Sequence, residues 1–290
     1  MTESGGSEAG GAATRRIVIE RPFIDVTGAK GGWADPWPNV AELAGVLPHN
    51  QWTLIGGLMT QMHAIHRGVD AVRPTNDVDI VLHIETGRGA PVATAKALKT
   101  IGYEMKENID PRNNMGHRWT RGKSHVDVVT SGDGDSGDRR HWDEKDQDIV
   151  DVVVADHPAP SIEERMRRMD MVKIAGGTQA LKRTANYRLK IVSGETTTIS
   201  VPQPFGALVL KAAAYKTDSR DRDRHLDDAA VLLACIDDPF VEKESFAGSD
   251  LSRLLFIQDK LVREHAAWRR MPREDAQRAQ QVLRVLCATD

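Results

Sequence analysis

The chain has 290 residues, a formal net charge of −3 and a hydrophobic fraction of 40%. This length allows one large domain or two modest ones with real cores. The near-neutral charge gives no global signature of a nucleic-acid-binding protein. No apolar run approaches the roughly 20 residues of a membrane span, which argues against a transmembrane protein. The stretch 1–14 is rich in Gly, Ala, Ser and Glu and lacks a signal-peptide pattern, so we expect a disordered tail and a cytoplasmic protein.

The charges are distributed unevenly along the chain. Residues 127–156 contain ten acidic and three basic residues, residues 161–190 contain three acidic and eight basic, and residues 251–284 contain four acidic and eight basic. Separated regions of opposite sign suit a metal site beside a polyanion-binding face. Each run is also compatible with ordinary solvated surface.

In the first 200 residues, expected strands alternate with expected helices. The apolar run Trp52 to Ile55 is cut off by two glycines, which is typical of a buried strand that enters a tight turn. Helical spacing follows from Leu58 to His66. Further strands are expected within 15–25 and at 78–84, 125–129 and 149–154, further helices at 39–46 and 91–101, and a hairpin at 184–192 and 196–201.

After Pro202 the pattern becomes helical. Amphipathic helices are expected at 205–217, 226–235, 251–268 and 273–287. We therefore predict an α+β fold in which a mixed sheet is flanked by helices and followed by a helical C-terminal part. The predicted division is a tail at 1–14, a sheet domain at 15–202 and a helical domain at 203–290.

Three aspartates carry the strongest chemical signal. Asp77 and Asp79 are two residues apart on an expected strand, so their side chains lie on the same face. Two aligned carboxylates repel each other unless a cation or a proton lies between them. Oxygen ligands of this kind suit Mg²⁺, and Asp127 on another expected strand can supply a third carboxylate. Three such carboxylates can hold two metal ions that activate a hydroxyl and bind a triphosphate.

The glycine pair before the aspartates suits a phosphate. Gly56 and Gly57 let the backbone approach an anion closely, and the helix that they open presents free N–H groups. Arg73 and Thr75 can add donors to phosphate oxygens. Each feature alone is weak, because a glycine pair is usually only a turn and an Asp-x-Asp sequence is usually surface charge. The ordered combination is much more specific.

Together these residues resemble the nucleotidyltransferase superfamily related to DNA polymerase β. Its pattern is a hydrophobic strand, Gly-Gly or Gly-Ser, a helix, Asp-x-Asp and a later strand aspartate. Within it the chain looks most like the AbiEii group of toxins from bacterial toxin–antitoxin and phage-defence systems, which includes the MenT toxins. In that group a lysine follows an apolar run and a later helix carries arginines and aspartates, which residues 205–211 and 222–228 resemble.

The resemblance implies specific roles. The nucleotidyltransferase type of fold would hold Mg²⁺, or alternatively Mn²⁺, on Asp77, Asp79 and Asp127. Lys211 would contact the nucleotide phosphates, and Asp228 would support the site from the helical part. From chemistry alone Lys211 is equally well a snorkelling surface lysine, and Lys216 is a rival for its role.

The function expected from this pattern is the transfer of a nucleotide from an NTP to an acceptor hydroxyl with release of pyrophosphate. By resemblance the acceptor is the 3′ end of a tRNA, a cognate antitoxin is a partner, and the basic segments 161–190 and 251–284 face the RNA. A small-molecule acceptor, as in antibiotic-modifying relatives, and a protein acceptor remain open. The residues are also compatible with a non-catalytic nucleotide-binding module and with a nuclease-like or phosphatase-like metal enzyme.

Overall fold

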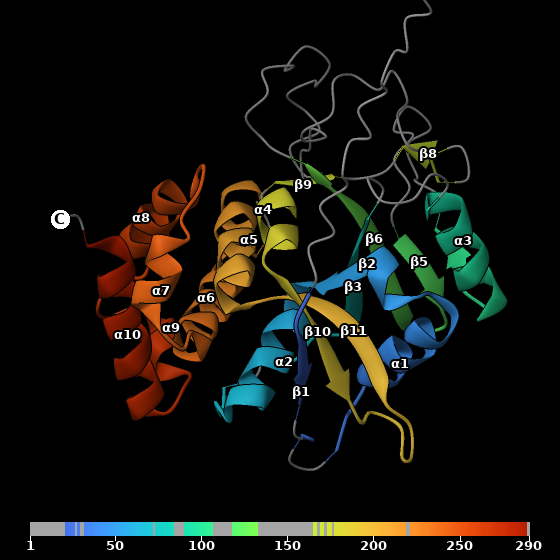
Figure 1. Ribbon diagram of the computed structural model, residues 1–290, viewed down its shortest axis with the longest axis horizontal. Helices are drawn as coiled ribbons and strands as arrows, with labels where there is room; N and C mark the ends of the chain where they lie inside the picture. The colour runs from blue at the N-terminus through green and yellow to red at the C-terminus, as the bar shows by residue number, and fades with distance from the viewer. Residues whose placement is uncertain are drawn as a thin grey trace, which may run out of the picture.

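A computed structural model gives the fold of the chain (Figure 1). It describes residues 21–26, 28–29, 32–71, 73–83, 90–106, 118–132, 165–166, 169–170, 173–175, 177–218 and 221–288. The expected tail at 1–14 and the expected strand at 149–154 lie outside these ranges. Among the residues that the structure describes, we find no helix with the length and apolar character needed to span a bilayer.

The larger sheet of the described chain is mixed. Its main path runs β2 (Trp52–Ile55), β3 (Asp77–Leu82), β6 (Ser124–Gly132), β5 (Arg118–Arg121) and β4 (Glu104–Met105), and β9 (Lys173–Ala175) also pairs with β6. Strands β3 and β6 are parallel, whereas β2 and β5 run antiparallel to their neighbours. The expected strands at 52–55, 78–84 and 125–129 are therefore confirmed, and the short strands β4, β5 and β9 were not predicted.

A smaller sheet packs beside the larger one. It contains β1 (Phe23–Asp25), β10 (Thr184–Leu189) and β11 (Thr197–Pro202), and a separate pair is formed by β7 (Arg165–Met166) and β8 (Met169–Asp170). The antiparallel pairing of β10 with β11 confirms the expected hairpin. Strand β11 contacts β2, which joins the two sheets.

Short helices flank the sheets. They are α1 (Trp37–Val46), the 3₁₀ helix η1 (His49–Gln51), α2 (Gly56–Arg67), α3 (Ala90–Thr100) and α4 (Gly177–Lys182). Helix α2 follows β2 directly and packs on both β2 and β3. Its start is therefore held against the strand that carries Asp77 and Asp79.

The C-terminal part is helical, as predicted. It contains α5 (Pro204–Thr217), α6 (Asp223–Cys235), α7 (Pro239–Glu244), α8 (Asp250–Lys260), α9 (Ala266–Arg269) and α10 (Arg273–Cys287). Helices α5 and α6 pack together, and α6 also contacts α2. They lie between the sheets and the remaining C-terminal helices (Figure 1).

The prediction of a single helix at 251–268 is wrong. Helix α8 ends at Lys260 and α9 begins at Ala266. In the gap, the Val262 carbonyl accepts a hydrogen bond from the Trp268 indole, and the His265 ring accepts from the Ala267 N–H at the start of α9. These side-chain bonds satisfy backbone groups that a continuous helix would otherwise pair internally.

One hydrophobic core joins the sheets to the helices. It includes Trp52 and Leu54 of β2, Val128 of β6, Phe205 of α5 and Leu232 of α6, all fully buried. The described chain thus has an α+β fold with mixed sheets flanked by helices. A division into two domains at residues 202 and 203 stays a prediction.

Candidate functional site

The parallel pairing of β3 and β6 brings the three predicted aspartates together. Asp79 and Asp127 are direct partners in the register, and Asp77 lies on the same face of β3, two residues before Asp79. One ligand oxygen from each of the three lies within 4.8 Å of the others. Val78 and Ile80 are fully buried on the opposite face, so the alternation of β3 fixes which side chains reach the cluster.

The cluster is electrostatically strained without a cation. The pKa of Asp79 is raised from 3.8 to about 7, first because the carboxyl is desolvated and then because Asp77 and Asp127 are negative neighbours. Lys211 and Arg224 oppose this rise. An all-oxygen set of three close carboxylates has the donor chemistry of a Mg²⁺ or Mn²⁺ site, so these residues fit the expected metal.

The glycine pair is required by close packing against the cluster. Gly56 has φ +71°, and a Cβ added there would lie 1.9 Å from Oδ2 of Asp79. A Cβ added to Gly57 would lie 2.8 Å from the Thr75 side chain. The Thr75 hydroxyl in turn donates a 2.7 Å hydrogen bond to Asp77. The first turn of α2 thus touches both carboxylates of β3, either directly or through Thr75.

Arg118 is a site residue that sequence reasoning missed. It is the antiparallel partner of Asp127, and its Nε and Nη2 donate to the two Asp127 oxygens at 2.9 and 2.6 Å. The side chain of Asp127 is 11% exposed, whereas that of Arg118 is 41% exposed. The pair is bidentate and raises the pKa of Arg118, mainly through this hydrogen bond. No sequence signal identified it, because strand pairing sets the contact.

Lys211 and Asp228 meet in the helical part of the site. Nζ of Lys211 lies 2.7 Å from Oδ2 of Asp228, and both residues are almost fully buried. Arg73 reaches the same carboxylate at 3.4 Å. The pKa of Asp228 is lowered even though desolvation, the largest effect on it, acts to raise it, because Lys211 and Arg73 outweigh the desolvation. The rival Lys216 is exposed and lies over the Phe256 ring, so Lys211 is the lysine beside the cluster.

The start of α6 adds a second group that was not predicted. Arg224 is close enough to lower the pKa of Asp79, and it pairs with Asp218 at 2.8 Å. His225 lies 2.9 Å from the same carboxylate, and its pKa is lowered to about 4 by burial and by the charge of Lys211. His225 is therefore neutral near pH 7 and helps to hold Asp218 in place.

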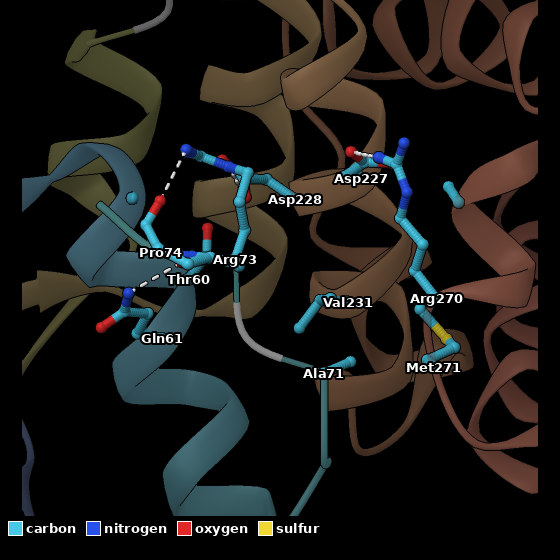
Figure 2. A pocket seen from close by; sticks show the side chains of 12 residues that line it. Thr60, Gln61, Ala71, Arg73, Pro74, Asp227, Asp228, Val231, Arg270 and Met271 are labelled. Carbon is cyan, nitrogen blue, oxygen red and sulfur yellow. Dashed lines mark hydrogen bonds and ion pairs between the residues drawn. The ribbon is translucent and has the colours of Figure 1, made fainter.

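A pocket of about 300 Å³ lies between helices α2 and α6 (Figure 2). Predicted site residues Gly57, Arg73 and Asp228 line it, together with residues of α2, α6 and the 266–271 region that sequence reasoning did not single out. The sequence cannot reveal such a pocket, because its walls come from four segments that are far apart in the chain.

The chain matches no protein-family model, no curated protein and no solved structure. Any assignment of function therefore depends on the geometry of the chain's own residues.

Proposed function

We propose that the protein is a metal-dependent nucleotidyltransferase with the nucleotidyltransferase type of fold. The observation that supports this most is the convergence of Asp77, Asp79 and Asp127 against a glycine turn that opens a helix. A cluster of carboxylates alone would equally suit a nuclease or a phosphatase. The adjacent helix start, with free backbone N–H groups, adds a place for a triphosphate.

In this proposal the site residues have different roles. Asp77, Asp79 and Asp127 hold Mg²⁺, or Mn²⁺, which neutralises triphosphate charge and polarises the reacting oxygens when bound. Gly56, Gly57 and Thr75 shape the phosphate-binding turn. Lys211 and Arg73 place positive charge beside it, and Asp228 fixes both cations at their present positions.

In this proposal the donor and the acceptor bind on different sides of the aspartates. Helix α2 packs on β2 and β3, whereas Asp127 lies on β6 and Arg118 on β5, on the other side of β3 from β2 in the sheet order. A nucleotide on α2 thus leaves the Asp127 side for the acceptor. The acceptor oxygen attacks the α-phosphorus, the bond to the bridging oxygen breaks and pyrophosphate leaves. Asp127 takes the hydroxyl proton, since a carboxylate that accepts two hydrogen bonds from Arg118 keeps further acceptor positions.

The proposed acceptor is the 3′ end of a tRNA, and the proposed protein partner is a cognate antitoxin. The support is the resemblance to the AbiEii group and the basic segment 251–284, in which Arg263, Arg269, Arg273 and Arg284 are exposed. Exposed arginines suit contacts with RNA phosphates. The other basic segment, 161–190, lies partly outside the described residues.

The test is incubation of the purified protein with Mg²⁺, each of four α-labelled NTPs and total bacterial RNA. The protein is expected to move label from one NTP into RNA of tRNA size. Asp77→Asn should lose this activity, and Asp70→Asn, which changes an exposed aspartate outside the site, should keep it. Transfer that survives Asp77→Asn would contradict the proposed site.

A failure to label RNA would distinguish the remaining functions. Metal-dependent NTP binding without transfer to RNA would overturn the tRNA proposal and favour a small-molecule acceptor, a protein acceptor or a non-catalytic module. Metal binding with no preference for triphosphates would favour a nuclease-like or phosphatase-like enzyme. Labelling of an aminoglycoside panel would then identify a small-molecule transferase.

A further inference from the structure

The larger sheet has one buried face and one polar face. The buried face carries side chains that are at most 8% exposed, namely Val78, Ile80, Val126, Val128, Trp119 and Met105. Because side chains alternate along a strand, the residues between these point to the other face. That face holds the aspartate cluster on β3 and β6, and it continues over β5 (Figure 1) and β4. We call its part on β6, β5 and β4 the polar face.

The strand register places two cations in line with the aspartates. Asp79 is the partner of Asp127, and Asp127 is the partner of Arg118. The Lys106 N–H donates to the Arg118 carbonyl at 2.8 Å, so Lys106 continues this row at the end of β4. Since adjacent strands are about 4.8 Å apart, the cations follow the cluster at intervals of one strand. Exposure rises along the row, because the Asp127 side chain is 11% exposed, that of Arg118 is 41% exposed, and Lys106 is exposed.

A second row on the polar face carries hydrogen-bonding groups. His125 is the partner of Asp77 on one side and of Thr120 on the other, and Glu104 is in turn the partner of Thr120. His125 and Thr120 are both half-buried. An imidazole ring and a hydroxyl suit the stacking and hydrogen bonding of an unpaired base. Glu104 repels phosphates, which leaves the first row as the line for a phosphate backbone.

The two rows together have the chemistry of a strand of nucleic acid. Phosphates recur along such a strand and bind arginine and lysine, and bases recur beside them. At the end of the strand, the phosphate of the last nucleotide is attached to the same sugar as the 3′ hydroxyl. A 3′ hydroxyl at Asp127 therefore places this phosphate near Arg118 and the preceding one towards Lys106. A cationic small acceptor such as an aminoglycoside would gain nothing from these two cations.

We propose that the polar face binds the 3′ end of a single-stranded RNA. Successive phosphates lie on Arg118 and Lys106, and the last base lies against His125 and Thr120. The terminal hydroxyl then lies at Asp127, beside the other metal-binding aspartates. The role of this end as acceptor rests on the proposed transferase function. Binding of the strand does not, since it requires neither an NTP nor transfer.

The test is binding of a fluorescein-labelled single-stranded RNA of about eight nucleotides to the full chain, with Mg²⁺ and without NTP. Fluorescence anisotropy over a series of salt concentrations gives the dissociation constant and its salt dependence. Lys106→Met is expected to weaken binding about threefold to tenfold and to reduce the salt slope by about one. An RNA of the same sequence with uncharged methylphosphonate linkages is expected not to bind.

Lys99→Met is the matched control for the loss of an exposed lysine. Lys99 is exposed on α3. Arg121, which alternates with Thr120 and so points to the buried face, donates to the Ile101 carbonyl just after this helix. The control should therefore bind RNA like the wild type. The proposal is overturned if Lys106→Met binds as tightly as Lys99→Met, or if the methylphosphonate RNA binds as tightly as the charged one.

A second measurement places the end of the strand without a variant. An RNA with 4-thiouridine at its 3′ terminus is irradiated on the protein, and the cross-linked peptide is identified by mass spectrometry. We expect the cross-link within residues 118–127. A cross-link found only within residues 251–284 would overturn the placement of the terminal nucleotide.

The failure of this inference and the failure of the transferase can be told apart. RNA binding that depends on Lys106, without label transfer from any NTP, would support the polar face and count against the transferase. Label transfer into RNA in which Lys106→Met leaves the KM for RNA unchanged would support the transferase and overturn the polar face as the binding surface.

Discussion

Replacing Asp79 with asparagine is expected to stabilise the metal-free protein at alkaline pH. The pKa of this carboxyl is raised from 3.8 to about 7 in the folded state, so folding favours the protonated form. Between these two values the folded chain binds a proton that the unfolded chain has lost. Stability is therefore lost as the pH rises through this window, and it is not regained above pH 7. Asparagine has a similar shape and no charge, so it avoids this loss.

The size of the effect follows from the shift. About three pKa units at 1.36 kcal/mol each give an upper limit of about 4 kcal/mol at pH 8. Asp79 is partly exposed, so solvent screening reduces this value, and we take about half, or roughly 2 kcal/mol. At pH 5 the pH is only a little above the lower pKa of 3.8, so only part of the stability has been lost. The advantage of the variant should then be below about 1 kcal/mol.

The assay is urea unfolding in EDTA at pH 5 and pH 8. The free energy of unfolding of Asp79→Asn is compared with that of the wild type and of Asp70→Asn, which removes an exposed carboxylate. Added Mg²⁺ should stabilise the wild type at pH 8 and have little effect on Asp79→Asn. The expected pKa effect is refuted if Asp79→Asn is no more stable than the wild type at pH 8, or if its advantage is the same at both pH values.

Three further substitutions probe the surroundings of the cluster. Gly56→Ala should cost at least about 2 kcal/mol in urea unfolding, because the backbone is left-handed and the new Cβ would collide with Asp79. Lys211→Met should cost about 3 kcal/mol by leaving the buried Asp228 with one distant partner, whereas Lys216→Met should be nearly neutral in the same assay. Arg118→Met removes a cation beside the carboxylates and should tighten Mn²⁺ binding severalfold in calorimetry, and unchanged or weaker binding would contradict this electrostatic effect.

The sequence predicted best those features of the site that a single stretch of the chain determines. A buried run that ends in glycines defined β2 and the turn into α2, and the Asp-x-Asp pattern on β3 placed two carboxylates on one face by strand alternation alone. The third aspartate was correctly placed on a strand. Its partnership with Asp79 depends on the parallel register of β3 and β6, which no local pattern specifies.

What the sequence did not predict depends mostly on side-chain and strand contacts that periodicity does not reveal. Arg118 lies in a four-residue strand whose residues are mostly only half-buried, so its sequence shows little of the apolar alternation that marks a strand. The break after Lys260 depends on the Trp268 and His265 side chains, which satisfy backbone groups where helical periodicity continues. Helix α7 had a readable signal, since Asp238 caps it and Pro239 occupies its first turn.

Under the proposed function, the Arg118–Asp127 pair would lie where the acceptor meets the metal-binding aspartates. Both oxygens of Asp127 accept hydrogen bonds from one guanidinium, which occupies two of the about four acceptor positions of the carboxylate. Under the proposed function the acceptor arrives on this side of the cluster, and the arginine side chain is 41% exposed, which leaves it room to turn outwards. An acceptor that carries a phosphate offers the guanidinium an alternative bidentate partner. Under the proposed function, arrival of such an acceptor would draw Arg118 away from Asp127, whereas a neutral acceptor would leave the pair in place.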